Sequence, residues 1–386
     1  MLNLSKLFSS SSANGEDFIT QLTLTSAQEA AIEDAREEIR ECLRQTLPGN
    51  LELLGAMQDA QAPKPRFFTQ GSHAYQTLNA PAYASQQADI DDGAYLPVGF
   101  VSQADRPSTA VDVFFAAVEM SLSPFCEKKG WKLITEKDTC SRVEISTWAH
   151  VDIPLYAIPD DEFKSITAKS MAMDYSIALE EAAIRAELDV WEKVPTEHVL
   201  LADRKKGWRA SDPRPLKKWF NEAVAEKGIQ LRRVVRYLKA YRDWKWPDGG
   251  SPSSVLLMAA AVPLFERIEG RDDLALLNVL DRLPEALRAG VLHPANPADP
   301  VESLTGWLGE EKVETAAVRF AEFARLLRAA VNSSNPDNAI TALRNEFGER
   351  FPMRPDLAKV VALSDEIDAV PAKLQPSPII VKTDAA

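Results

Sequence analysis

Residues 65–97 read PRFFTQGSHAYQTLNAPAYASQQADIDDGAYLP and set a Gly-Ser turn, Gly71-Ser72, ahead of two carboxylates, Asp89 and Asp91. Glycine lets the backbone come close to a phosphate, and the free N–H groups at the start of a helix favour anions. Alternate residues of a strand point to one face, so Asp89 and Asp91 project together while Ile90 enters the core. The stretch therefore predicts a turn that cradles a triphosphate, followed by a carboxylate pair that holds a metal.

A third carboxylate is expected beside this pair. Asp152 lies in the alternating run HVDIPLYAIP, residues 150–159, which predicts a strand. Magnesium takes hard oxygen ligands, so Asp89, Asp91 and Asp152 predict a site for two magnesium ions, with manganese as an alternative. In such a site one ion lowers the pKa of an attacking hydroxyl and the other stabilises a leaving pyrophosphate.

The carboxylate pair has a simpler interpretation, which is a solvated strand edge. For a bare Asp-x-Asp pair that interpretation is the commoner one, and the preceding Gly-Ser turn reverses the preference. Asp92 points to the opposite strand face and precedes Gly93, which indicates a role in a turn. His73 and His150 flank the motifs, and we expect hydrogen-bonded neighbours because two distant histidines do not indicate a zinc site.

Composition places the chain among soluble globular proteins. It has 386 residues, of which 45% are hydrophobic and 26% charged, and a formal net charge of -13. Its apolar runs fall short of the about 20 residues of a membrane span, and its three widely spaced cysteines suit a reducing compartment. We expect a cytoplasmic protein with no membrane partner. The acidic balance argues against a broad nucleic-acid surface and leaves small anionic ligands open.

The order of the patterns predicts a mixed-sheet lobe followed by a helical lobe. A loose lead-in is expected over residues 1–24. A helix should follow, which begins at a capping box of Ser26 and Glu29 and ends at Pro48 and Gly49. Further expected elements are a weak helix over 51–64, a short helix over 73–80, a strand over 88–92, an apolar helix over 111–126, a hairpin of 142–147 and 150–157, and helices from about 163 onward. The expected domains are 1–205 for the N-terminal helix and sheet core, 206–370 for the helical lobe and 371–386 for a flexible tail.

Several motifs occur together in a specific order. They are FTQGS, TLN, DIDDG and VDIPLYAIP in the first lobe, then SDP, LKAYRDWKW and SSVLLMAA in the second. With them the chain resembles the cGAS/DncV-like nucleotidyltransferases of bacterial antiphage signalling. The resemblance implies an α+β fold, in which a polymerase-beta-type core of mixed sheet flanked by helices joins a C-terminal helical lobe, with the active site in the cleft between them. It also implies magnesium-dependent joining of ATP and GTP by 3'-5' bonds into 3',3'-cyclic GMP-AMP or a close relative, as a second messenger in antiphage defence.

Nucleotide contacts follow from the same resemblance. The implied positions are Gln70, Gly71, Ser72, His73, Ala74, Tyr75, Arg142, Ser211, Lys239, Ser254 and Asp299. Lys239 also shares a helical face with Arg232 and Arg236 and could offer charge to phosphates, although the same face could be solvated. The loop DGGSPSSV is one residue longer than its counterpart in the family, which would shift Ser254 and alter base preference.

A basic stripe of Arg36, Arg40 and Arg44 recurs at helical spacing. Together with Arg66, the stripe matches basic positions that bind an inhibitory folate-like molecule in the family. Each arginine of the stripe can also pair with the glutamate three residues before it, these being Glu33, Glu37 and Glu41. A solvated helix face is therefore slightly favoured over a regulatory site.

The resemblance also implies partners. The product would activate a downstream effector, and ubiquitin-like transfer enzymes could act on the C-terminal residues 383–386. The sequence has no Cys/His cluster for a zinc thumb, so we expect no activation by DNA, and we expect a monomer. Three other functions stay open: a synthase of another cyclic or linear oligonucleotide, a template-independent nucleotidyl transferase that acts on a different acceptor, and a nucleotide sensor that binds without turnover.

Overall fold

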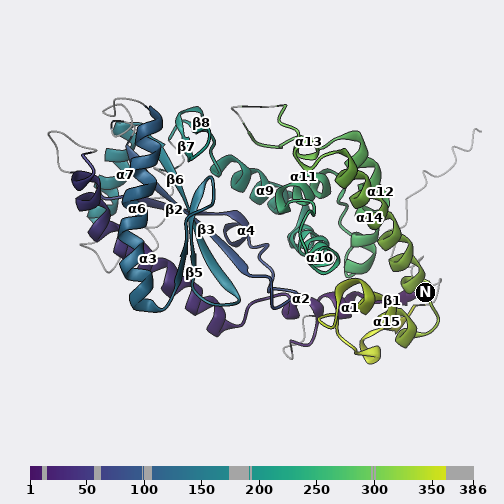
Figure 1. Ribbon diagram of the computed structural model, residues 1–386. Coiled ribbons are helices and arrows are strands. Elements are labelled where there is room, and N and C mark those ends of the chain that lie inside the picture. Colours follow the sequence, from purple (N-terminus) through teal and green to yellow (C-terminus); the bar gives the residue numbers. More distant parts are fainter. Residues whose placement is uncertain are drawn as a thin grey trace, which may run out of the picture.

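The computed structural model describes residues 1–10, 15–55, 62–97, 99, 107–173, 191, 194–296, 299 and 301–361. In this part of the chain one lobe is built on a mixed sheet and the other on helices, and the two lie side by side (Figure 1). The predicted α+β fold class is confirmed. The sheet lobe is described first because it carries the candidate site.

A seven-stranded sheet forms the base of the first lobe. Its strands are β2 (Arg66–Gln70), β3 (Ala88–Pro97), β4 (Lys132–Ile134), β5 (Cys140–Glu144), β6 (Ala149–Ile158), β7 (Leu200–Asp203) and β8 (Gly207–Ala210). The order runs β2-β3-β6-β5-β4, and β7 pairs with both β6 and β8. The long strands β3 and β6 are parallel, whereas the other pairs are antiparallel. The predicted hairpin of β5 and β6 is confirmed.

Strands β7 and β8 lie where the sequence predicted helix, so the prediction of helices from about 163 onward is wrong there. Tyr156 of β6 is the register partner of Leu201 in β7. Leu201 and Ala202 are buried by this pairing. A four-residue strand has too short an alternation to stand out in a sequence, and the end of β6 beyond its pairing with β5 supplies the hydrogen bonds that stabilise it.

Helices α3 (Ser26–Leu53) and α6 (Pro107–Lys129) cover one face of the sheet (Figure 1). The predicted apolar helix at α6 is confirmed, and its Phe114 is fully buried in the core under α3. Helix α3 runs through Pro48, where the sequence predicted its end. Leu47 and Leu51 on either side of the proline are both fully buried in this core, so packing outweighs the hydrogen bond that Pro48 cannot donate.

The start of α3 differs from the prediction by one residue. Thr25 is the N-cap, and its hydroxyl accepts a hydrogen bond from the Gln28 N–H at 3.2 Å. The Gln28 side chain in turn accepts the Thr25 N–H at 2.9 Å. The predicted box of Ser26 and Glu29 is wrong because two adjacent pairs share the same spacing, and the preceding backbone decides between them.

The two faces of β3 and β6 differ in chemistry. Tyr95 and Tyr156 stack with ring centroids 4.6 Å apart on the face away from α3, where helix α7 (Asp160–Met173) lies. Because side chains alternate along a strand, Asp92 faces α3, while Asp91 and Asp152 face away from it. Strand β3 continues to Pro97, so the predicted turn role of Asp92 is wrong.

The second lobe is helical. It comprises α9 (Arg214–Lys227), α10 (Ile229–Lys245), α11 (Ser254–Leu264), α12 (Asp272–Ala289), α13 (Leu304–Leu308), α14 (Glu310–Val331) and α15 (Pro336–Phe347), followed by the 3-10 turn η3 (Pro355–Leu357). The other 3-10 turn, η2 (Thr196–His198), lies in the sheet lobe just before β7. The apolar faces of the helices share one core. The predicted helical lobe is therefore confirmed.

The N-terminal segment packs with the helical lobe. Strand β1 (Leu2–Asn3) pairs with β9 (Lys359–Val360), and helices α1 (Ser5–Phe8) and α2 (Phe18–Gln21) follow. Leu4 and Phe8 are fully buried in the helical core. The prediction of a loose lead-in is wrong for the described residues here, because the apolar side chains find partners at the far end of the chain.

The domain boundaries at 205 and 370 stay predictions. The sheet lobe extends through β8, and α9 begins the helical lobe. The predicted tail, residues 371–386, lies outside the described residues, as does most of the weak helix predicted near 51–64 beyond α3. None of the helices in the described ranges combines the length and the apolar character needed to cross a membrane.

Candidate active site

The parallel pairing of β3 with β6 brings the predicted carboxylates together. Asp91 is the register partner of Asp152, and Asp89 is the partner of His150. Ligand atoms of Asp89, His150 and Asp152 all lie within 4.8 Å of one another. Residues about sixty positions apart in the sequence thus form one cluster on the central strands.

The donor atoms of this cluster fit a divalent cation. His150 Nε2 lies 2.9 Å from Asp89 Oδ1, yet both atoms are buried without a hydrogen-bond partner among the described residues. Carboxylate oxygens suit magnesium and manganese, and a ring nitrogen suits transition metals. Buried polar atoms that face each other without hydrogen-bond geometry are atoms that a bound cation would satisfy.

His150 is more than the hydrogen-bonded neighbour that the sequence predicted. Its Nδ1 does lie 2.9 Å from Gln87 Oε1, which confirms that part of the prediction. The other ring nitrogen joins the carboxylate cluster. Alternation along β6 places His150 and Asp152 on one face, and this spacing was the available signal.

Asp91 lies against the turn at Gly71-Ser72, which the sequence predicts to cradle a triphosphate and which we call the phosphate turn. Burial, and then the carboxylates of Asp89 and Asp152, raise the pKa of Asp91 well above its usual range. A cation beside it would offset this repulsion between like charges. A Cβ added at Gly71 would lie 1.9 Å from Asp91 Oδ2, and the Gly71 φ is +69°. Glycine is therefore required at this position both for conformation and for space.

Arg142 of β5 orients Asp152. Its Nε donates to Asp152 Oδ1 at 2.6 Å, and its Nη2 donates to Asp152 Oδ2 at 2.8 Å. A bidentate pair of this kind fixes the plane of the carboxylate. The nucleotide contact predicted for Arg142 stays a prediction, because the guanidinium already binds a site carboxylate.

A cavity of about 340 Å³ opens beside Asp89, between the two lobes. Its lining includes Ser72 from the sheet lobe and Lys239 and Ser254 from the helical lobe. Lys239 is buried and donates from Nζ to the Thr77 carbonyl at 2.6 Å. The structure thus brings three predicted nucleotide contacts to one cavity with a site carboxylate, and the solvated alternative for Lys239 is wrong.

The same cavity contains residues that the sequence reasoning missed. Arg242 and Trp246 line it, and Arg242 donates from Nη1 to Ser254 Oγ at 2.9 Å. Arg242 lies three residues after Lys239 on α10, so helical spacing was the signal for it. Trp246 ends the helix, and its direction depends on tertiary packing.

The remaining turn residues lie outside the lining of this cavity. Helix α4 (Gly71–Ala74) is shorter than the helix predicted over 73–80. Gln70 donates from Nε2 to Tyr156 Oη at 3.0 Å, and Tyr75 is buried at the edge of the helical core beside Ala74. His73 pairs with a glutamate of α3. Nucleotide contacts by these residues stay predictions.

Two further predicted contacts come from loops. The Ser211 N–H donates to the Val199 carbonyl at 3.0 Å, just after β8. Asp299 precedes α13 and accepts the Val301 N–H at 3.2 Å. Neither is among the residues that line the cavity beside Lys239. Their roles toward a nucleotide stay predictions.

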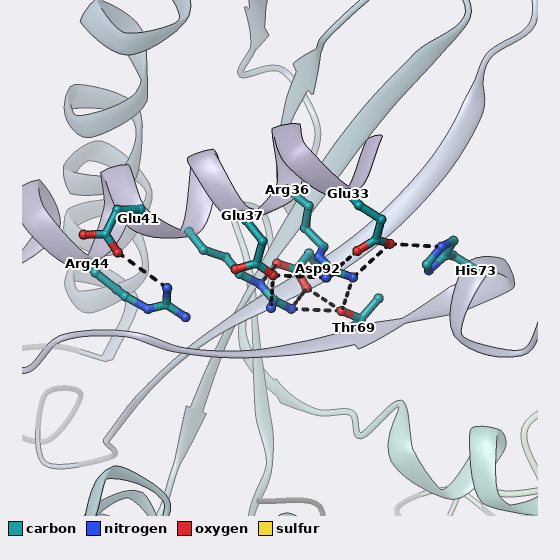
Figure 2. Close-up of polar contacts among 9 residues, drawn as sticks. Glu33, Arg36, Glu37, Glu41, Arg44, Thr69, His73 and Asp92 are labelled. Atoms are coloured by element: carbon teal, nitrogen blue, oxygen red, sulfur yellow. Dashed lines mark hydrogen bonds and ion pairs between the residues drawn. The ribbon is translucent and has the colours of Figure 1, made fainter. Parts of the chain in front are cut away.

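The basic stripe of α3 is paired within the chain (Figure 2). The ion pairs are Arg36–Glu33 at 2.5 Å, Arg40–Glu37 at 2.9 Å and Arg44–Glu41 at 3.6 Å. The predicted glutamate pairing is confirmed. The face is nevertheless not simply solvated, because the Arg40 side chain is only 14% exposed and also binds Asp92. Arg66 lies on β2, where its Nε donates to Thr167 Oγ1 at 3.2 Å, and folate-like binding stays a prediction.

Two family models match the chain. "Cyclic GMP-AMP synthase DncV-like, nucleotidyltransferase domain" matches residues 65–156, and "Cyclic GMP-AMP synthase, C-terminal domain" matches residues 228–358. The first range contains the phosphate turn and all three carboxylates. The second begins just before α10, which carries Lys239, and ends after η3.

Curated relatives and solved structures agree with these models. The chain is 35% identical over 304 residues to a cyclic GMP-AMP synthase of Escherichia coli, and this match covers 74% of this chain and 68% of the relative. It is 32% identical over 305 residues to the cyclic GMP-AMP synthase of Vibrio cholerae, and this match covers 74% of this chain and 67% of the relative. Vibrio cholerae DncV in complex with the linear intermediate 5' pppA(3',5')pG superposes with a TM-score of 0.75 at 24% identity, covering 94% of this chain and 99% of that one. Escherichia coli DncV in its 3'-deoxy GTP bound form superposes with a TM-score of 0.72 at 25% identity, and the match covers 93% of this chain and 100% of that one. The chain therefore belongs to the DncV-like cyclic GMP-AMP synthase family of nucleotidyltransferases.

Proposed function

We propose that this protein joins ATP and GTP by 3'-5' bonds into 3',3'-cyclic GMP-AMP or a close relative. The contact of the Gly71 turn with Asp91, beside the cluster of Asp89, His150 and Asp152, carries the proposal. It places a turn suited to a triphosphate next to carboxylates suited to a cation. The relatives named cyclic GMP-AMP synthase support this product class.

Asp89, Asp91 and Asp152 are the residues that would hold two magnesium ions, or manganese. Bound there, the ions would lower the pKa of the attacking 3'-hydroxyl and stabilise the charge of the leaving pyrophosphate. Arg142 keeps the Asp152 carboxylate in one plane, and Gly71 lets the backbone reach the phosphates. Both contributions come from groups that are in place before substrate binds.

Ser72, Lys239 and Ser254 are the proposed nucleotide contacts of the cavity. Lys239 is held by the Thr77 carbonyl, so its ammonium group keeps one position beside the triphosphate site. Arg242 positions the Ser254 hydroxyl. Because these groups come from both lobes, a nucleotide in the cavity would contact both at once.

We infer that the product acts as a second messenger in antiphage defence in the cytoplasm. Family membership supports this inference. A product-activated effector and ubiquitin-like transfer enzymes that act on the C-terminus are the proposed partners. The chain has a formal net charge of -13, and because DNA binding depends on clustered positive charge, this supports a mechanism without a DNA activator.

The test is a product assay. Purified protein is incubated with magnesium and each pair of ribonucleoside triphosphates, treated with phosphatase and analysed by tandem mass spectrometry against standards of known linkage. We expect a phosphatase-resistant product that contains one adenosine and one guanosine. Removal of the metal by a chelator, or Asp89→Asn combined with Asp91→Asn, should abolish it.

The matched control is Asp112→Asn, which removes an exposed carboxylate of α6 and should leave synthesis unchanged. A phosphatase-sensitive product would indicate a synthase of linear oligonucleotides instead. Absence of both product and pyrophosphate for every mixture, with magnesium-dependent ATP binding intact, would indicate a nucleotide sensor and contradict the proposal.

A further inference from the structure

On the sheet face opposite the candidate site, Arg40, Thr69 and Asp92 form one hydrogen-bonded unit, which we call the brace. Arg40 donates from Nε to Asp92 Oδ2 and from Nη2 to Asp92 Oδ1, both at 2.6 Å. The same Nη2 donates to Thr69 Oγ1 at 2.9 Å, and the Thr69 hydroxyl donates to Asp92 Oδ1 at 2.9 Å. Asp92 is 2% exposed. The unit thus joins α3, β2 and β3 around one buried charge.

A buried carboxylate bound by a bidentate guanidinium has little freedom to move. Charge-assisted hydrogen bonds are stronger than neutral ones, and the planar fork of arginine fixes the carboxylate orientation as well as its distance. Removing one partner would leave the other buried and unpaired. The brace therefore holds its three elements at fixed positions relative to one another.

The brace lies one residue from the groups that meet in the candidate site. Thr69 is the register partner of Asp92, and the next pair in the ladder is Gln70 with Asp91. Gly71 follows Gln70 and contacts the Asp91 carboxylate. A slip or rotation of β2 against β3 would move the phosphate turn and Asp91 apart, and the brace opposes that motion from the other face.

A second contact ties the same helix to the turn itself. His73 of α4 lies 3.2 Å from Glu33, which also pairs with Arg36 (Figure 2). Arg36 reaches Thr69 Oγ1 at 3.4 Å. Helix α3 thus contacts both the strand before the phosphate turn and the short helix that contains it.

We propose that the brace is a positioning device for the nucleotidyl transfer site: Arg40 of α3 locks Asp92 and Thr69 so that Gly71 and Asp91 keep the spacing needed for metal and triphosphate. Arg40, Thr69 and Asp92 act through their neighbours and touch no substrate. The proposal rests on the proposed function. It predicts that loss of the brace lowers turnover and weakens metal binding while substrate affinity at saturating metal stays the same.

The experiment compares Arg40→Gln, Asp92→Asn and the double variant with the wild-type protein. Each single variant should lower kcat by about 100-fold, as expected for a displacement of reacting groups by about 1 Å, with KM for the triphosphates unchanged. The magnesium concentration for half-maximal rate should rise. The double variant should lose no more than either single variant, because both remove one unit.

A control variant and a second readout separate an effect on positioning from an effect on folding. Glu38→Gln breaks the ion pair between α3 and Lys129 of α6, touches neither β2 nor β3, and should keep wild-type kcat. The second readout needs no turnover: manganese added without nucleotide should raise the Tm of wild-type and Glu38→Gln protein and raise that of the brace variants less. Rates are measured well below each Tm.

The positioning role of the brace is refuted if Arg40→Gln and Asp92→Asn keep the wild-type kcat and the wild-type rise of Tm with manganese. A loss that Glu38→Gln reproduces to the same extent would also refute it, since the effect would then be general to α3. If wild-type protein makes no product, the proposed function fails instead, and the manganese-dependent Tm still decides whether the brace positions the metal site.

Discussion

Gly71 is the residue at which backbone conformation and the proposed chemistry meet. A side chain there would collide with the Asp91 carboxylate, and the φ of +69° disfavours any residue with a Cβ. Among the described glycines with positive φ, Gly71 would bring an added Cβ nearest to another atom, and Gly348, which would lie 2.7 Å from the Trp244 ring, is the next tightest. The restriction at Gly71 explains why a Gly-Ser pair precedes the carboxylates in the sequence.

We predict that Gly71→Ala lowers kcat by more than about 100-fold, because Asp91 must rotate away from its site. Gly130→Ala is the matched control, since Gly130 has a φ of +70° and nothing within 4 Å of an added Cβ. Both variants carry the same backbone strain. Steady-state kinetics of the two should therefore differ, and equal losses would show that strain alone is responsible.

Lys239 should give nucleotide binding a pH dependence. Burial, and then the neighbouring Arg242, lower the pKa of Lys239 to about 7. A bound triphosphate favours the charged ammonium, so binding above pH 7 must take up a proton. We expect wild-type affinity to weaken by up to about tenfold per pH unit above about pH 7. Calorimetric titrations of Lys239→Met should show a flat profile, and a retained slope would assign the effect to another group.

The segment over residues 77–86 joins the sheet lobe to helix α10. Its contacts are the Thr77 carbonyl with Lys239, the Asn79 side chain with Arg236, the Tyr83 hydroxyl with the Trp244 carbonyl and the Gln86 side chain with the Asp243 carbonyl. It also lines the cavity beside Asp89. One segment thus sets the distance between the carboxylates and the helical lobe.

The stack of Tyr83 on Trp244 offers a test of this role. The ring centroids lie 4.8 Å apart at an angle of 3°. Stacked aromatic pairs contribute about 0.5–1.5 kcal/mol beyond area burial, so Tyr83→Ala should raise KM for the triphosphates by up to about tenfold. Tyr83→Phe keeps the stack and loses only the hydroxyl bond to the Trp244 carbonyl, so its KM should rise less. An unchanged KM in Tyr83→Ala would mean that the remaining contacts suffice.

Across the whole molecule, the first described residues stabilise the helical lobe. The Phe8 ring lies edge-on to Tyr237 of α10 at 5.1 Å and to Phe351 near the end of the described chain at 5.2 Å. Asp273 of α12 is fully buried and accepts hydrogen bonds from Leu4 N–H and Ser5 Oγ. The two ends of the described chain are therefore part of one folded unit.

We predict that Phe8→Ala lowers the free energy of unfolding by about 3–5 kcal/mol, because a fully buried aromatic ring leaves a cavity. Lys6 is exposed on the same helix, so Lys6→Ala should change the free energy of unfolding by less than about 0.5 kcal/mol. Denaturant unfolding followed by circular dichroism measures both. Equal midpoints for the two variants would show that the N-terminal segment contributes nothing to the lobe.

Local patterns in the sequence were sufficient for several features of the site. Alternation predicted that Asp89 and Asp91 share a strand face, and the glycine predicted the close turn at Gly71. The spacing of Glu33 and Arg36 predicted their ion pair. Each of these depends on residues a few positions apart, whose relative directions the periods of helix and strand already determine.

Tertiary structure alone decided the rest. The parallel register of β3 and β6 placed Asp91 beside Asp152 and brought His150 into the cluster. Packing of α3 on the opposite face of the sheet placed Arg40 against Asp92. Short strands β7 and β8, the burial of the N-terminal segment and the cavity between the lobes likewise depend on partners far along the chain. Such contacts are set by strand register and by the packing of whole elements, which no short-range period encodes.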